Sequence, residues 1–109
     1  MNNSLQEKLL LLKRGYIKKL ETMTPEFESL AEKISVSTLD EIYVKVHTIS
    51  GTSGMYGLTD LSDFSTDFEL YLKEIKNDVN LYDGDVLKDK LLSYIKKIEE
   101  IVFTGDKND

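Results

Sequence analysis

Apolar residues recur at every third or fourth position through most of this chain of 109 residues. This interval is the period of one face of an α-helix, so each such stretch predicts an amphipathic helix. The predicted helices cover residues 4–23, 25–34, 59–79 and 85–101. Thr24 and Pro25 separate the first two, because a threonine followed by a proline is typical of a helix start. Asp85 can cap the last helix, and Gly105 stands where a helix stop belongs.

Residues 39–51, which read LDEIYVKVHTISG, fit two different patterns. Alternating residues that are mostly β-branched favour a strand, and these are Ile42, Val44, Val46 and Thr48. An apolar stripe at helical spacing favours a helix, and its members are Leu39, Ile42, Val46, Ile49 and Ser53. Every other segment is helical, and a lone strand would have no partner with which to pair. The prediction for this segment is therefore a helix.

Four main amphipathic helices joined by short connections predict an all-α fold, an antiparallel four-helix bundle with an additional short helix near the N-terminus. The length predicts one domain over residues 1–109. Its ends, the first few residues and about 104–109, are expected to fray.

Composition excludes several classes of function. The chain holds 14 basic and 20 acidic residues, and this net charge of -6 disfavours binding to nucleic acid. It has no cysteine and one histidine, which excludes disulfides, thiolate nucleophiles and a metal site built from several histidines. No segment reads as a signal peptide or as a membrane span. The sequence therefore predicts a cytoplasmic protein that binds neither nucleic acid nor membrane.

The single histidine stands in a glycine-rich stretch, VHTISGTSGMYGL, which holds three of the six glycines. On a helix, His47, Gly51 and Gly54 lie along one face, about 100° round the axis from the apolar stripe at Val46. Each helical glycine costs about 1 kcal/mol relative to alanine. That repeated cost beside one imidazole predicts an open approach to His47. An imidazole can act as a nucleophile and carry a group near neutral pH.

This stretch resembles the signature of histidine phosphotransfer (HPt) domains of bacterial and fungal phosphorelays. The family pattern has an aliphatic residue two positions after the histidine, a lysine three after, a glycine four after, small residues, and a glycine ten after. The corresponding residues here are His47, Ile49, Ser50, Gly51, Thr52, Ser53 and Gly57. The family also has Glu or Gln 22 positions after the histidine, where this chain has Glu69. The match covers about residues 39–72, and the expected bundle extends it to nearly the whole chain.

The resemblance implies a phosphocarrier rather than an ATP-dependent kinase. His47 would accept a phosphoryl group from an aspartate of a receiver domain and pass it to another receiver in a two-component phosphorelay. Glu69 would bind the other ring nitrogen and orient the imidazole. The family needs no cofactor of its own, and Mg²⁺ belongs to the receiver partner. Partners are response-regulator receiver domains, with a hybrid histidine kinase as a further candidate.

Two further expectations follow from the resemblance. Ser50 stands at the usual lysine position, and a hydroxyl supplies a hydrogen bond but no charge. Receivers dock on HPt domains through a mixed apolar patch around the histidine. The residues expected to give access and form this patch are Val44, Gly51, Gly54, Met55 and Leu58. Scattered surface apolar residues are the alternative explanation for the exposed members of this set.

Two alternatives to phosphotransfer stay open. The missing lysine favours a degenerate HPt domain that docks a receiver, or scaffolds a larger kinase, without carrying a phosphoryl group. A plain helical oligomerisation domain is the other alternative, and an exposed, reactive His47 would count against it. A lone histidine is by itself more often structural or merely exposed, so His47 stands out through the glycine spacing and the family pattern together.

Overall fold

The computed structural model describes residues 2–107, and its elements are helical throughout that range. The α-helices are α1 (Asn2–Glu32), α2 (Leu39–Met55), α3 (Thr59–Asn77) and α4 (Gly84–Lys107). Two short 3₁₀-helices, η1 (Val36–Thr38) and η2 (Val79–Leu81), lie in the connections before α2 and α4. The predicted all-α four-helix bundle is confirmed.

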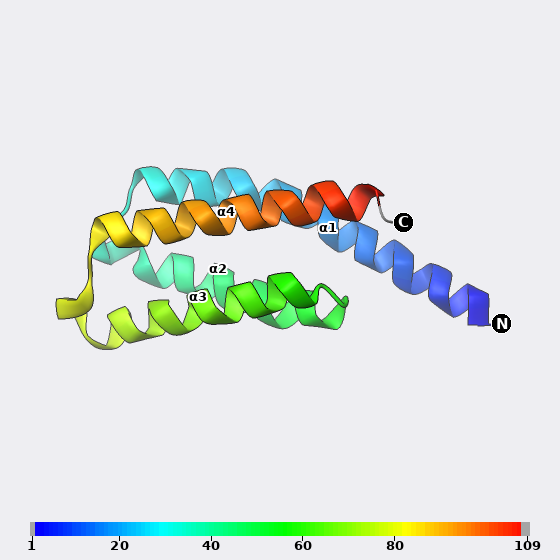
Figure 1. The fold of residues 1–109 in the computed structure, drawn as a ribbon, viewed down its shortest axis with the longest axis horizontal. Helices are drawn as coiled ribbons and strands as arrows, with labels where there is room; N and C mark the ends of the chain where they lie inside the picture. The colour runs from blue at the N-terminus through cyan, green and yellow to red at the C-terminus, as the bar shows by residue number, and fades with distance from the viewer. Residues whose placement is uncertain (1, 108–109) are drawn as a thin grey trace.

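The bundle consists of two antiparallel helix pairs (Figure 1). α2 packs most extensively against α3, and α1 packs against α4, whereas α3 and α4 meet over a smaller area. The molecule is elongated, with extents of 55 × 22 × 17 Å. The N-terminal part of α1 extends beyond the ends of the other helices (Figure 1). Its apolar stripe accordingly stays exposed at Leu5, Leu9 and Leu12 and becomes buried only from Tyr16 onward.

The ambiguous segment around the histidine is helical, as predicted. α2 buries one continuous face, formed by Leu39, Ile42, Val46, Ile49 and Ser53. These are the five residues of the helical stripe read from the sequence. Burial of this face against the other helices outweighs the β propensity of the branched residues, because packing decides most helical stability in proteins.

The expected break at Thr24 and Pro25 is wrong. α1 continues through Pro25, so residues 25–34 do not form the separate short helix that was expected near the N-terminus. A proline inside a helix lacks the N–H that would bond to the carbonyl four residues earlier, which is here Glu21. The Thr24 hydroxyl donates to that Glu21 carbonyl oxygen at 2.9 Å. The threonine therefore satisfies the acceptor that the proline leaves unpaired, instead of capping a new helix.

Both ends of α4 also differ from expectation. The side chain of Asp83, rather than Asp85, caps the helix and accepts from the backbone N–H groups of Asp85 and Val86 at 3.0 and 3.2 Å. Gly105 does not stop α4, which runs to Lys107. A Cβ added to Gly105 would lie 2.5 Å from Cδ1 of Ile17, so this glycine permits close packing against α1. The fraying expected at the first few residues and at about 104–109 stays a prediction, and residues 1 and 108–109 lie outside the described residues.

Candidate functional site

His47 of α2 and Glu69 of α3 form the centre of the candidate site. Nδ1 of His47 lies 2.6 Å from Oε2 of Glu69. The His47 side chain is 64% exposed, whereas that of Glu69 is only 18% exposed. An ionised carboxylate can only accept a hydrogen bond, so Nδ1 carries the proton and donates it. Nε2 of the neutral ring then holds a lone pair on an exposed side chain.

A series of side-chain contacts between α2 and α3, called the ladder below, fixes this pairing. Ser50 Oγ lies 2.8 Å from Thr66 Oγ1, one turn further along α2 and about one turn back along α3. In the opposite direction, Lys76 Nζ lies 2.9 Å from Asp40 Oδ1. Because the two helices are antiparallel, each step forward on α2 matches a step backward on α3. The contact between His47 and Glu69 is therefore one rung of a continuous register.

The ring of Tyr43 stacks on the imidazole, a contact that the sequence analysis missed. The ring centroids of Tyr43 and His47 are 5.9 Å apart, with planes inclined by 11°. The ammonium group of Lys76 lies 4.1 Å from the centroid of Tyr43. The signal available in the sequence is the spacing, because residues four apart on a helix are neighbours. Tyr43 limits the orientations open to the His47 ring.

The three glycines of the stretch serve different purposes. A Cβ added to Gly51 would meet no atom within 4 Å, so this position is open, as expected beside His47. A Cβ added to Gly54 would lie 3.2 Å from Ser62 Oγ, so Gly54 lies against α3. Gly57 has a φ of +75°. The Leu58 N–H bonds to Ser53 O at 3.0 Å and the Gly57 N–H bonds to Gly54 O at 3.2 Å, which is a Schellman helix end.

The residues expected to dock a partner separate into exposed and buried ones. Val44 is 59% exposed and Met55 is 80% exposed, so both are open to a partner. Leu58 is only 9% exposed and belongs to the core. The expectation that Leu58 forms part of an exposed patch is wrong, because α2 ends at Met55 and the Schellman turn directs Leu58 inward.

Polar side chains near the histidine are already engaged. The Ser50 hydroxyl contacts Thr66, and the Ser50 carbonyl oxygen accepts from Ser62 Oγ at 3.1 Å. Lys45 forms an ion pair with Glu26 of α1 at 2.7 Å. Helical geometry puts Lys45 about 160° round α2 from His47. Lys45 is thus no substitute for the lysine that the family pattern has at position 50. Thr66 and Ser62 were not singled out from the sequence, because their role depends on the register between α2 and α3.

The arrangement places one ring nitrogen of an exposed imidazole against a carboxylate, which is the geometry that favours a single tautomer. Among residues 2–107, no group of three His, Cys, Asp or Glu side chains is arranged to hold a metal ion. Within the same range, none of the helices is both long enough and apolar enough to cross a membrane.

Comparison with known proteins identifies a family. A family model described as Hpt domain matches residues 18–99, well over half of the chain. Neither the curated proteins nor the solved structures gave a match. The matched range includes both His47 and Glu69. The chain therefore belongs to the Hpt domain family, the histidine phosphotransfer domains of phosphorelays.

Proposed function

We propose that His47 accepts a phosphoryl group on Nε2 from a receiver-domain aspartate and passes it to another receiver. The observation that carries this proposal is the 2.6 Å contact between His47 Nδ1 and Glu69 on a histidine that is 64% exposed. One ring nitrogen is held by the protein, and the other is left to react. The membership in the Hpt domain family supports the same chemistry.

The transfer conserves atoms and charge. The lone pair on Nε2 attacks the phosphorus of the aspartyl phosphate, and the Nε2–P bond forms. The bond between phosphorus and the aspartyl oxygen breaks, and its electron pair leaves with the carboxylate. The imidazole keeps its proton on Nδ1 and becomes cationic, while the phosphoryl group stays anionic. Transfer to the next receiver is the same step in reverse, with a different aspartate oxygen as the attacking atom.

Glu69 has two roles in this step. Before transfer, it orients the ring and holds the proton on Nδ1, so that Nε2 is the nucleophile. As the ring becomes cationic, the hydrogen bond to the carboxylate becomes charge-assisted at both partners and therefore stronger. Glu69 thus stabilises the developing charge more than it stabilises the neutral ring, which is the condition for lowering a barrier.

The receiver would dock on the exposed side of α2 that surrounds His47. Val44 and Met55 offer apolar contacts there, and Gly51 leaves room for close approach. In this proposal the chain holds no cofactor, and the Mg²⁺ needed for aspartate chemistry comes with the receiver.

The test is transfer from phosphorylated receivers. The purified chain would be incubated with a panel of receivers labelled on aspartate, alongside His47→Gln as the matched control. We expect label on the unmodified chain that is stable in base and labile in acid, as a phosphoramidate bond is, and none on His47→Gln. A receiver that binds without giving label would identify the chain as a docking module instead. In that case Ser50→Lys would test whether the missing lysine is the cause.

A further inference from the structure

A phosphoryl group on His47 would stand beside a site with no obvious positive charge. The position that holds lysine in the family pattern is Ser50, whose hydroxyl contacts Thr66. Lys45 is paired with Glu26 on another side of α2. Lys76 is held by Asp40 and by the ring of Tyr43. None of these groups supplies an uncommitted cation beside Nε2.

Lys73 lies between two contacts of the ladder. On α3 it stands between Glu69, which contacts His47, and Lys76, which contacts Asp40. It is about 6 Å along the helix axis and about 40° round it from Glu69. The residue opposite Lys73 on α2, by the same register, is Tyr43, which stacks on the imidazole. Lys73 therefore belongs to the edge of α3 that borders the candidate site.

The direction of helical side chains brings Lys73 and His47 closer. Side chains in a helix lean toward its N-terminus and cover the preceding turn. For Lys73 this rule favours the level of Glu69. His47 leans toward the level of Tyr43, as their stacking confirms. Because the helices are antiparallel, these two directions shorten the distance along the helix pair that the ammonium group must cover to reach a group on the imidazole.

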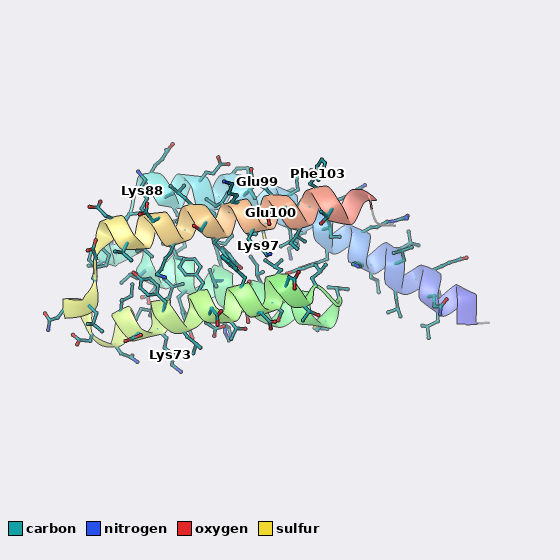
Figure 2. All side chains as sticks on the ribbon, in the orientation of Figure 1. Lys73, Lys88, Lys97, Glu99, Glu100 and Phe103 are labelled. Carbon is teal, nitrogen blue, oxygen red and sulfur yellow. The ribbon has the colours of Figure 1, made fainter. Side chains whose placement is uncertain are left out.

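Lys73 is free to act. It is exposed, and among residues 2–107 it makes no ion pair or hydrogen bond. Figure 2 shows its side chain extending from α3 away from the bundle. A flexible, uncommitted lysine can reorient toward an anion that arrives on a neighbouring side chain, because its stem has four carbons and its head carries three donors.

We propose that Lys73 binds the phosphoryl oxygens on His47 and supplies, from α3, the positive charge that the family pattern has on α2. The inference rests on the proposed function and adds a second residue to the same site. Lys73 Nζ donates hydrogen bonds to the phosphoryl oxygens, and these bonds are charge-assisted at both partners. The lysine stabilises the transferring group, while Glu69 stabilises the ring.

The test uses phosphoramidate, a small donor that needs no protein partner. Nε2 attacks its phosphorus, the P–N bond breaks, and ammonia leaves. The initial rate of His47 labelling and the lifetime of the label would be measured for the unmodified chain and for Lys73→Gln. Lys88→Gln is the matched control, because Lys88 is also an exposed helical lysine, yet it lies on α4 on the opposite side of the bundle in Figure 2.

We expect Lys73→Gln to lower the labelling rate about fivefold at low salt, while Lys88→Gln leaves it unchanged. The difference should shrink in about 1 M salt, where the Debye length is about 3 Å. Adding Ser50→Lys to Lys73→Gln should restore the rate, since it returns a cation to the family position. A purely structural role of Lys73 would not give this rescue.

The possible failures are distinguishable. Label on the unmodified chain that Lys73→Gln slows no more than Lys88→Gln does would overturn the role of Lys73 and leave the proposed function intact. No label on the unmodified chain, from phosphoramidate or from any receiver, would overturn both.

Discussion

Gly54 of α2 and Ser62 of α3 approach so closely that a Cβ on the glycine would lie 3.2 Å from the serine hydroxyl. That hydroxyl also donates to the Ser50 carbonyl oxygen at 3.1 Å, so it cannot turn away without losing a hydrogen bond. The pair sets how near the two helices of the site can lie.

Replacement of Gly51 and of Gly54 by alanine should have different effects on stability. Gly51→Ala meets open space and should raise the free energy of unfolding by about 1 kcal/mol, the helix-propensity difference. Gly54→Ala gains the same helix propensity but must displace the Ser62 hydroxyl. Its free energy of unfolding should therefore be about 1 kcal/mol lower than that of Gly51→Ala. Urea unfolding of both variants measures this difference. Equal stabilisation would show that the helices separate without cost.

Gly57→Ala should destabilise the chain by about 1–2 kcal/mol, because its φ of +75° is unfavourable for a residue with a Cβ. Chemical unfolding measures the loss. Gly15→Ala is the control, since Gly15 is helical and a Cβ there would meet no atom within 4 Å. Gly57→Asn, which tolerates this conformation better, should recover part of the stability. A neutral Gly57→Ala would contradict the role of the turn.

Substitution of Glu69 should alter the tautomer of His47 as well as the rate. Glu69→Leu removes the acceptor for Nδ1 and should slow phosphoryl transfer roughly ten- to a hundredfold. Glu69→Gln keeps an acceptor oxygen without the charge and should lose less. Nitrogen chemical shifts of the imidazole would report the proton on Nδ1 in the unmodified chain and a mixture of tautomers in Glu69→Leu. An unchanged tautomer in that variant would argue against an orienting role.

Two buried tyrosines should respond oppositely to removal of the hydroxyl. Tyr94 Oη lies 2.6 Å from Ser65 Oγ inside the core, so Tyr94→Phe leaves a buried serine unpaired and should cost about 1–3 kcal/mol. Tyr16 Oη is buried and has no hydrogen-bond partner among residues 2–107, so Tyr16→Phe should be neutral or slightly stabilising. Thermal unfolding compares the two. Adding Ser65→Ala to Tyr94→Phe should recover stability, because both polar partners are then gone.

Alkaline pH should unfold the protein through the same tyrosines. Burial, with a smaller contribution from Tyr56, raises the pKa of Tyr16 from 10.0 to about 12. Burial also raises the pKa of Tyr94. The folded state holds these protons more tightly than the unfolded state, so their contribution is complete below pH 10 and is lost as pH rises toward 12. Tyrosinate absorbance and circular dichroism, followed together, should show these two groups ionising only as the helices melt.

The fold class and most of the helices could be predicted because each depends on local spacing. The stripe of α2 read from the sequence is the face that the bundle buries, and the glycine beside His47 is open. Contacts across helices could not be predicted in the same way. Thr66, Ser62 and Tyr43 gain their roles from the register between α2 and α3 or from a stacking geometry, and neither is written in the spacing of one helix.

The errors have physical causes of the same kind. The local sequence of a threonine followed by a proline is the same at a helix start and inside a helix. The difference lies in the bond from the Thr24 hydroxyl to the Glu21 carbonyl. In the sequence, Gly105 likewise resembles a helix stop. Only its close packing against Ile17 of α1 shows why a glycine stands there. Leu58 is apolar and close in sequence to the histidine, and only the turn before it determines that it points inward.

The length of the turn between α2 and α3 determines which residues of the two helices face each other. Deleting or inserting one residue there leaves each helix free to form, but it moves every residue of α3 by about 1.5 Å along the axis and about 100° round it. Glu69 would then no longer face Nδ1, although no residue of the site had been altered. Substitutions within this turn are therefore expected to change the free energy of unfolding. A change in the length of the turn would instead remove the contact between Glu69 and His47 and so impair phosphoryl transfer.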